Sequence, residues 1–369
     1  MLRIVAGSCG AFLIWIALRD VFQSVIVPRA ADRRLRLSYY MSSMLWSIWP
    51  RIGWRIADED KREDFFGTYA PFAMVATLIT WVVVLIIGYG LIFYAISDQL
   101  RPQPVNLWKA LYFAGTTMLT IGFGDYVGNT GIARGISLAA GASGLSVVAV
   151  VTAYLFAVFG SFQRREVFVT FLGSRSGSPP SGIGLITVHA FNGILDDLPA
   201  LFVQGQQWTS EVMESHLAYP ILSYFRSSHD YESWVGALGT LLDAATLLLT
   251  TADGSRQHGQ ARIMYWTGRH LVHDFVKYFG LRTTEGAGIE RYEFLQARLR
   301  LAELGLKLTD EETSWTAFSN LRGTYAPGLS AMANFWRIPP LQWIGDRSLV
   351  TVKHIREQMA EKLDTERVP

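Results

Sequence analysis

The sequence predicts an all-α membrane protein that carries a separate helical domain in its C-terminal half. Of the 369 residues, 50% are hydrophobic and 17% are charged, against about 25% charged in ordinary soluble proteins. Two stretches, 65–97 and 135–163, contain no Asp, Glu, Lys or Arg. No long run alternates apolar with polar residues, as a half-buried strand would. This hydrophobicity also excludes a disordered chain.

Charge is distributed unevenly along the chain. Residues 1–165 carry 15 Lys and Arg against 9 Asp and Glu, whereas residues 166–369 carry 18 against 22. The first part is therefore apolar and basic, and the second is slightly acidic. The single cysteine, Cys9, excludes a disulfide framework and a zinc site built from cysteines. The formal net charge of +2 implies no nucleic-acid partner.

Three segments are candidates for membrane helices. A spanning helix needs about 20 apolar residues, and both 71–96 and 135–163 qualify. The second of these is rich in small residues, which suit close helix packing in lipid. A third segment, 2–28, is interrupted by Arg19 and Asp20. A secretory signal is the alternative for it, but no A-x-A-like cleavage site follows, so we expect an N-terminal membrane helix.

The distribution of basic residues predicts the topology. Eight Lys and Arg lie between 29 and 62, but only Arg101 and Lys109 lie between 97 and 131. Cytoplasmic loops carry the excess of basic residues, so we place 29–68 and everything after 164 in the cytoplasm. Three Trp and two Arg within 37–57 fit a helix in the membrane interface, with an amphipathic packing helix as an equal alternative.

The predicted outer loop holds a Gly-rich motif. Residues 107–119 form an apolar helix too short to cross the membrane, and Thr120-Ile121-Gly122-Phe123-Gly124-Asp125 follows it. Alternate glycines permit a positive φ, so that successive carbonyls can be directed to one side. Several copies around an axis would form rings of carbonyl oxygens that replace the hydration shell of a cation. Such irregular backbone is tolerated at membrane depth where it lines water.

The motif and its setting resemble the pore domain of potassium channels. The filter signature of that family is T-V-G-Y-G-D, and this chain has T-I-G-F-G-D-Y-V after Thr116-Thr117-Met118-Leu119. The version here is most similar to the second filter of two-pore-domain potassium channels. The order of helix, short pore helix, filter and helix is also that of the superfamily. The resemblance covers about residues 69–163 and implies a potassium-channel-like helix–pore loop–helix fold.

The resemblance implies a role for each matching residue. Backbone carbonyls of the filter would bind K⁺, with the Thr120 hydroxyl at the cytoplasmic end, and Asp125 would brace the outer mouth. The implied ion-binding residues are Thr120, Ile121, Gly122, Phe123 and Gly124, and the implied filter supports are Asp125, Thr116 and Thr117. One filter per chain means that a ring needs four chains, so a homotetramer is expected.

The second membrane helix of the pore supplies further candidates. Gly144 lies 20 residues after Gly124, where the family has its inner-helix hinge, and Gly141 is a second hinge candidate. Close packing is an equally good reading of both glycines. Four residues at helical spacing beyond Gly144 are expected to line the cavity, and the alternative is that they face the outer helix. These residues are Leu145, Val148, Thr152 and Phe156, the last a candidate constriction.

Three positions depart from the family pattern. Phe123 replaces the usual Tyr, so the hydroxyl that would tether the filter to its pore helix is missing. Thr116 stands where some members have Glu, and Leu119 replaces a common Thr. Fewer tethers suggest a softer filter that itself gates or inactivates. No helix carries Arg at every third position, so a voltage sensor is not expected.

The C-terminal part is predicted to be helical. Residues 173–184 are rich in Gly, Ser and Pro and are read as a flexible linker. The run 235–252 is very apolar, but Asp243 at its centre would be costly in lipid. We therefore expect a buried helix of a soluble domain there. Assembly or docking is the expected role of this domain, and its gating ligand is not identified by the sequence.

A weak metal-site candidate lies in this domain. His270 and His273 are three residues apart on one predicted helix face, next to Asp274, a spacing that metal ligands use. A solvated face is the favoured reading. The chain is accordingly expected not to be an enzyme, and a membrane-tethered helical metal-binding enzyme or sensor is the alternative from another class.

The sequence thus predicts a potassium-selective channel that conducts K⁺ passively and needs no cofactor besides the ions in its pore. A non-selective cation channel is the nearest alternative. The expected location is a cell membrane crossed several times, with a lean toward a bacterial inner membrane and a cytoplasmic C-terminal domain. The expected segments are an N-terminal membrane helix (1–28), a basic cytoplasmic or interfacial segment (29–68), the pore domain (69–163), a linker (164–184) and a helical cytoplasmic domain (185–369).

Overall fold

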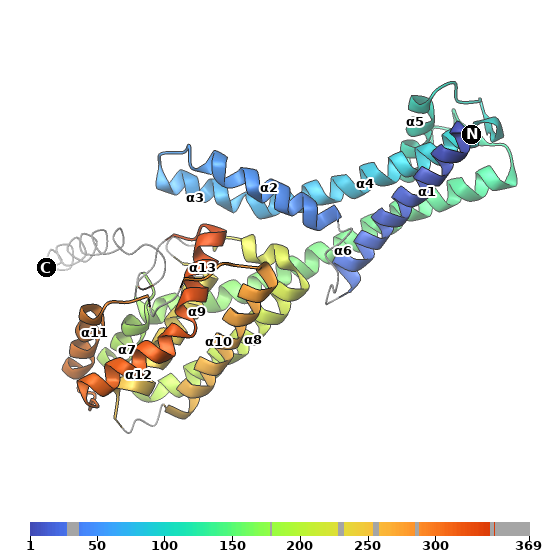
Figure 1. Ribbon diagram of the computed structural model, residues 1–369. Coiled ribbons are helices and arrows are strands. Elements are labelled where there is room, and N and C mark those ends of the chain that lie inside the picture. Colours follow the sequence, from blue (N-terminus) through green and yellow to red (C-terminus); the bar gives the residue numbers. More distant parts are fainter. Residues whose placement is uncertain are drawn as a thin grey trace, which may run out of the picture. The chain divides into compact units, whose positions relative to one another are not determined.

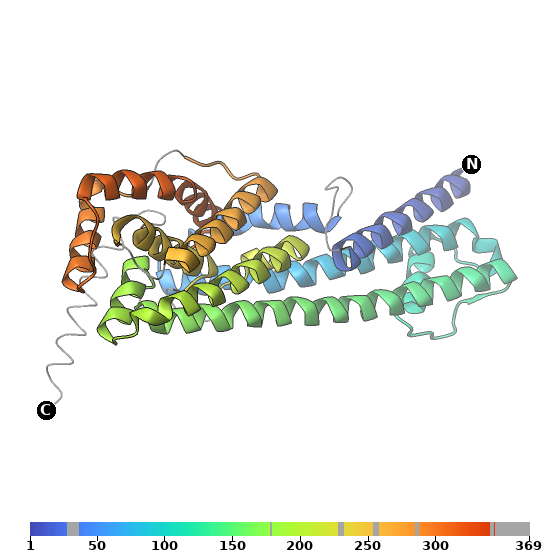
Figure 2. The same cartoon turned by 90° about the horizontal axis from the view of Figure 1, so that it is seen from below.

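The computed structural model describes residues 1–27, 37–177, 179–227, 232–253, 258–284, 288–339 and 343. Among these residues nearly all regular structure is helical, and the one sheet pairs β1 (Leu100–Arg101) with β2 (Val127–Gly128). The chain forms two compact units, Met1–Ser161 with His216–Phe225 and Phe162–Ser215 with Arg226–Pro369. Figures 1 and 2 trace the helices of both. The all-α fold class and the order helix, pore loop, helix are confirmed.

Four helical stretches among the described residues are long and apolar enough to cross a membrane: Leu2–Val25, Glu59–Ala95, Gly131–Ser176 and Trp234–Thr251. The first three belong wholly or largely to the first unit. That unit contains α1 (Leu2–Val21), a π-helical turn (Phe22–Ile26), α2 (Leu37–Gly53), α3 (Glu59–Gly67), α4 (Tyr69–Ala95), α5 (Leu107–Met118) and the part of α6 (Gly131–Ser176) up to Ser161.

Helix α1 packs along α4 through facing glycines (Figure 1). A Cβ atom added to Gly10 would lie 2.5 Å from the carbonyl oxygen of Gly88, and one added to Gly88 would lie 2.7 Å from Cγ1 of Ile14. Small residues allow helix backbones to approach this closely. The extra N-terminal helix therefore covers one side of α4.

Asp20, one of the two charged residues that interrupt the first apolar segment, is fully buried and hydrogen-bonded. The Asp20 carboxylate accepts hydrogen bonds from the Ser38 backbone N–H (2.9 Å), the Ser38 hydroxyl (3.0 Å) and the Trp81 indole N–H (2.6 Å). A buried carboxylate is tolerated when its oxygens have donors. Asp20 thus ties α1 to both α2 and α4.

Helix α2 packs against other helices, as the amphipathic packing alternative for residues 37–57 predicts. Trp46 contacts Tyr69 edge to face at 4.7 Å, and Trp49 stacks on Phe65 at 4.9 Å. The Tyr69 hydroxyl donates to the Ser42 carbonyl (2.8 Å). The opposite face of α2 is exposed and apolar, with Tyr40, Met44, Ile48 and Ile52. Four of the basic residues used for the topology prediction, Arg29, Arg33, Arg34 and Arg36, lie outside the described residues.

The segment expected as a linker, 164–184, is mostly helical. Helix α6 runs unbroken for 46 residues to Ser176, about 69 Å at 1.5 Å per residue, and α7 (Gly182–Phe191) begins at once behind the N-cap Ser181. Gly177, at φ 79°, follows the last turn of α6. A Cβ atom on Gly184 would collide with the Ser176 carbonyl oxygen. The Gly and Ser residues here close a tight corner between two helices, so the prediction of a flexible linker is wrong.

The second unit is built around α9 (Trp234–Thr251), of which every residue except Leu249 is buried. Helices α7, α10 and α12 pack on it. The prediction of a buried helix over 235–252 is confirmed, since 94% of its apolar window lies inside the protein. The other helices are α8 (Leu198–Ala218, whose last residues join the first unit), α10 (His258–Phe279), α11 (Arg291–Glu303), α12 (Glu311–Gly323) and α13 (Ala326–Trp336).

A buried polar network explains how α9 accommodates Asp243. Arg322 donates from Nε to Oδ1 of Asp243 (3.0 Å) and from a terminal nitrogen to the Trp343 carbonyl (2.7 Å). The Tyr325 hydroxyl donates to the same Oδ1 (2.7 Å). Burial, and then the Asp243 charge, raise the pKa of Tyr325 well above its ordinary value, so this hydroxyl stays protonated as a donor. The network joins α9, α12 and α13.

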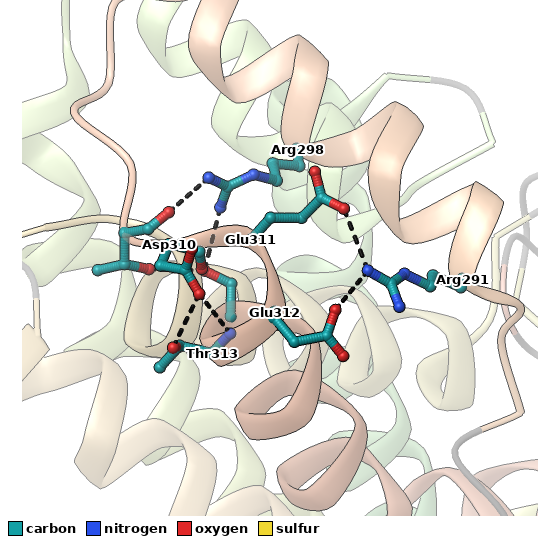
Figure 3. A network of polar contacts seen from close by, with 8 residues as sticks. Arg291, Arg298, Asp310, Glu311, Glu312 and Thr313 are labelled. Atoms are coloured by element: carbon teal, nitrogen blue, oxygen red, sulfur yellow. Dashed lines mark hydrogen bonds and ion pairs between the residues drawn. The ribbon is translucent and has the colours of Figure 1, made fainter.

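A second polar network fixes α11 to the start of α12 at the surface (Figure 3). Arg291 contacts Glu311 (3.2 Å) and Glu312 (2.5 Å). Arg298 donates to the Thr309 carbonyl and to the Ser314 hydroxyl (3.0 Å). Glu311 and Glu312 lie in the first turn of α12, where acidic side chains are favoured by the helix dipole. The position of these two carboxylates is therefore explained by their contacts with Arg291 and by the dipole of α12.

Candidate functional site

The short helix before the Gly-rich segment is held on two sides. Helix α5 begins at the N-cap Asn106, whose side chain accepts from the Lys109 backbone N–H (3.1 Å). It lies tightly against α4, because a Cβ atom on Gly90 would be 2.5 Å from Cδ2 of Leu111. Phe113 packs on Phe93 of α4, with ring centroids 4.6 Å apart. The helix therefore has a fixed position from which the next residues start.

The Gly-rich segment folds back onto the end of α5 through its own N–H groups. The N–H of Thr120 donates to the Thr117 carbonyl (3.1 Å), and those of Ile121 and Gly122 donate to the Thr116 carbonyl (2.9 and 3.2 Å). Thr116 and Thr117 thus contact the segment through backbone oxygens. The Thr116 hydroxyl itself donates to the Phe113 carbonyl (3.1 Å).

The backbone of the segment alternates in handedness. Thr120, Gly122 and Gly124 have positive φ of 58°, 60° and 78°. Glycine adopts this conformation readily, but a β-branched residue such as Thr adopts it only under strain. Strained backbone of this kind marks functional sites. A backbone that alternates in this way can direct successive carbonyls to one side.

One side of this segment is open in the single chain. All seven residues from 119 to 125 are exposed, with Ile121 at 51% and Phe123 at 68%. A Cβ atom added to Gly122 or Gly124 would meet nothing within 4 Å. The N–H groups are occupied on the α5 side, so this open side is the one available for a ligand or for further copies of the chain.

A residue that sequence reasoning missed lies beside Asp125. Tyr112 on α5 interacts electrostatically with the Asp125 carboxylate, and its ring meets Tyr126 edge to face at 6.2 Å. Tyr112 lies one helical turn before Thr116, which is the spacing that could have revealed it. It supplies a hydroxyl from α5 near Asp125, whereas Phe123, which replaces the Tyr of the family pattern, has none.

The two candidate hinge glycines face the end of α5. A Cβ atom on Gly144 would collide with the Met118 carbonyl oxygen and would lie 2.8 Å from the Met118 carbonyl carbon. One on Gly141 would lie 3.7 Å from the Thr117 carbonyl oxygen, an ordinary contact. Helix α6 continues unbroken through both (Figure 2). Gly144 is therefore a close-packing position in this conformation.

The four candidate cavity residues share an exposed face of α6. Leu145 is 66% exposed and Phe156 is 77% exposed, and Val148 and Thr152 are exposed between them. Val147 and Val151, on the opposite face, are buried in the core of the first unit. The alternative that the four residues pack against the outer helix is therefore wrong.

The candidate metal ligands in α10 do not form a metal site. Nε2 of His270 lies 3.4 Å from one oxygen of Asp274, and Nδ1 of His273 lies 3.6 Å from the other. Both imidazoles are largely exposed. Within the described ranges, no group of three or more His, Cys, Asp or Glu side chains is arranged to hold a metal ion. The two histidines contact separate oxygens of one carboxylate, so this candidate is wrong.

Comparison with known proteins agrees with this geometry. Residues 69–161 match a family described as "Ion channel". The uncharacterized membrane protein YdjJ of Bacillus subtilis is 26% identical over 183 residues, which are 48% of this chain and 52% of YdjJ, so the chain spans about half the length of that relative. No solved structure matches significantly. Residues 69–161, from α4 through α5 and the Gly-rich segment to α6, are thus similar to an ion channel family, and the described part of the chain has helices long and apolar enough to cross a membrane.

Proposed function

We propose that the protein is a potassium-selective channel in which residues 120–124 bind K⁺ through their backbone carbonyls. The observation that carries this proposal is the alternating positive φ at Thr120, Gly122 and Gly124, combined with N–H groups that bond back to α5. A backbone held in this way presents carbonyl oxygens to one side, where they replace the hydration shell of a cation. The Thr120 hydroxyl adds an oxygen at the cytoplasmic end.

The channel assembles as a homotetramer. A single chain presents its filter segment at an exposed surface and has no means of surrounding an ion. Closed rotational symmetry is the usual architecture of homo-oligomers, and four copies place four carbonyls at each level of a filter. The exposed apolar residues Leu145, Val148 and Phe156 then line the cavity below the filter. Gly141 and Gly144 allow this part of α6 to lie beside α5, the helix that precedes the filter.

The chain crosses a bacterial inner membrane, with the second unit in the cytoplasm. Residues 135–163 of α6 carry no charge, and Arg164 and Arg165 follow directly, as expected for a cytoplasmic end. The partners of the protein are K⁺ and lipid. It needs no cofactor besides the ions in its pore. The second unit serves assembly or gating.

The direct test is ion flux into liposomes that contain the purified full chain, with K⁺ and Na⁺ gradients compared. Gly122→Asp places a charged side chain at a position with positive φ in the filter and is the inactive control. We expect K⁺ flux to exceed Na⁺ flux at least tenfold and the variant to show none. Equal K⁺ and Na⁺ flux would indicate a non-selective cation channel, and flux that persists in Gly122→Asp would contradict the filter assignment.

Removal of the Tyr112 hydroxyl should weaken the outer end of the filter. Tyr112→Phe removes the hydroxyl that interacts with the Asp125 carboxylate and keeps the ring. We expect the current under sustained K⁺ to decay several-fold faster than in the wild type. Tyr126→Phe removes a neighbouring hydroxyl and should leave the decay unchanged. Equal decay in wild type and Tyr112→Phe would show that the Tyr112 hydroxyl does not stabilise the conducting filter.

A further inference from the structure

A ten-residue segment between α8 and α9 belongs to the first unit, although the chain on either side of it belongs to the second. We call this segment, residues 216–225, the wedge. It contains the end of α8 and the 3₁₀ turn Pro220–Tyr224. His216 and Leu222 are fully buried, and Ser223 is nearly so. The wedge is therefore an internal part of the pore-containing unit.

On one side the wedge contacts α6 through aromatic rings. Tyr219 meets Tyr154 edge to face at 5.5 Å, and Phe225 meets Phe159 edge to face at 5.9 Å. Tyr154 and Phe159 lie on either side of Phe156 in the sequence, and Phe156 is an exposed residue that the proposed function places in the lining of the cavity. A displacement of the wedge thus acts on α6 at the level of this cavity residue.

On its other side the wedge contacts α2 and α4. The ring of Tyr224 lies 4.9 Å from Trp46 and 5.0 Å from Tyr69. The segment therefore has aromatic contacts with α6, the inner helix of the proposed pore, and with α4, the outer helix. Packed interiors switch between discrete arrangements and do not deform continuously, so these contacts can transmit a movement.

Both ends of the wedge are attached firmly to the second unit. Its N-terminal end is the last turn of α8, a continuous helix from Leu198 to Ala218. Immediately after its C-terminal end, Arg226 donates to the carbonyls of Trp336 (2.9 Å) and Arg337 (2.7 Å). Arg337 is the left-handed C-cap of α13. The wedge therefore has to follow rearrangements of α8 and α13.

From these contacts we propose that the wedge is the element through which the second unit controls the gate. A rearrangement of α8 or α13 shifts residues 216–225, and the shift reaches α6 at Tyr154 and Phe159 and changes the open probability of the pore. This inference rests on the proposed channel function. It requires no particular stimulus, because any event that moves α8 or α13 is transmitted in the same way.

The experiment combines hydrogen exchange and single-channel recording on the full chain in lipid. Arg226→Ala removes the anchor on α13, and Tyr219→Leu removes a contact with α6 from within the wedge. Arg298→Ala is the matched control, because this arginine also donates to a backbone carbonyl in the second unit, that of Thr309 just before α12. We expect about tenfold faster exchange of amides 150–161 in both test variants, the effect of losing about one net hydrogen bond or packed contact. Open probability should change several-fold at unaltered K⁺/Na⁺ selectivity.

The outcomes separate this inference from the channel proposal. If exchange becomes faster only in 216–227 and α13 while amides 150–161 are unchanged, the wedge does not transmit movement to α6. This result would overturn the inference whether or not the protein conducts. Transmission to 150–161 with unchanged open probability would overturn the role in gating. Transmission in a protein that carries no ion flux at all would show that the proposed channel function fails, while the mechanical link itself stands. The same changes in exchange and open probability in Arg298→Ala would also contradict a specific role of the wedge in this transmission.

Discussion

Gly144→Ala is expected to reduce K⁺ flux in liposomes at least tenfold, whereas Gly141→Ala is expected to conduct nearly as the wild type does. The added Cβ at Gly144 collides with the Met118 carbonyl oxygen at the end of α5, and the one at Gly141 makes an ordinary 3.7 Å contact with the Thr117 oxygen. Backbone yields less easily than a side chain, and overpacking costs about 1–3 kcal/mol or more. The displaced atoms lie directly before the filter.

The two glycine variants are matched, since each adds one methyl group to the same helix one turn apart. Thermal unfolding of both proteins provides a readout independent of conduction, and Gly144→Ala should unfold at a clearly lower temperature than Gly141→Ala. Equal stability and equal flux in the two variants would show that α6 can move away from α5 without cost. In that case the hinge interpretation of Gly144 would regain support.

The second large effect is expected at the buried pair of the C-terminal unit. Asp243→Ala leaves the Arg322 guanidinium, which is fully buried, without its carboxylate and should cost about 3–5 kcal/mol of folding free energy. Denaturant unfolding followed by Trp fluorescence measures this loss. The double variant Asp243→Leu/Arg322→Met replaces both charges by apolar groups and should recover most of the stability.

The surface pairs provide the control for this experiment. Glu312→Gln weakens the exposed contact with Arg291 shown in Figure 3, and exposed pairs contribute little because solvent screens them. Its unfolding midpoint should match the wild type. A loss in Asp243→Ala no larger than in Glu312→Gln would mean that water or a rearranged side chain compensates the buried charge.

The membrane-length helices and the irregular backbone of the Gly-rich segment could be predicted because their signals are local. The charge-free runs 65–97 and 135–163 and the motif 120–125 are readable without knowing which residues meet. The packing of Gly144 on Met118 was undecidable from sequence, since a glycine in an apolar helix fits a hinge and a close contact equally well. The partner of Asp125 was missed because an exposed tyrosine on a short helix has many ordinary explanations.

Predictions failed where they rested on residue composition or spacing alone, without knowledge of which side chains are in contact. The Gly, Ser and Pro content of 173–184 indicated flexibility, but capped helix ends account for the same residues. His270 and His273 have a spacing that metal ligands use, yet each contacts its own oxygen of Asp274. The wedge had no sequence signal at all, because its role depends on pairs such as Tyr219 with Tyr154 that are distant in the chain.

The bonding of Asp20 has a consequence for biosynthesis. Its indole partner, Trp81, is 61 residues further along the chain, and Ser38 is 18 residues away. Until residues 38 and 81 have been translated, the carboxylate on α1 lacks these donors, and a charge in an apolar helix is unfavourable in lipid. We therefore expect α1 to reach its final place only after the first half of α4 has been translated. Asp20 makes the order of assembly differ from the order of synthesis.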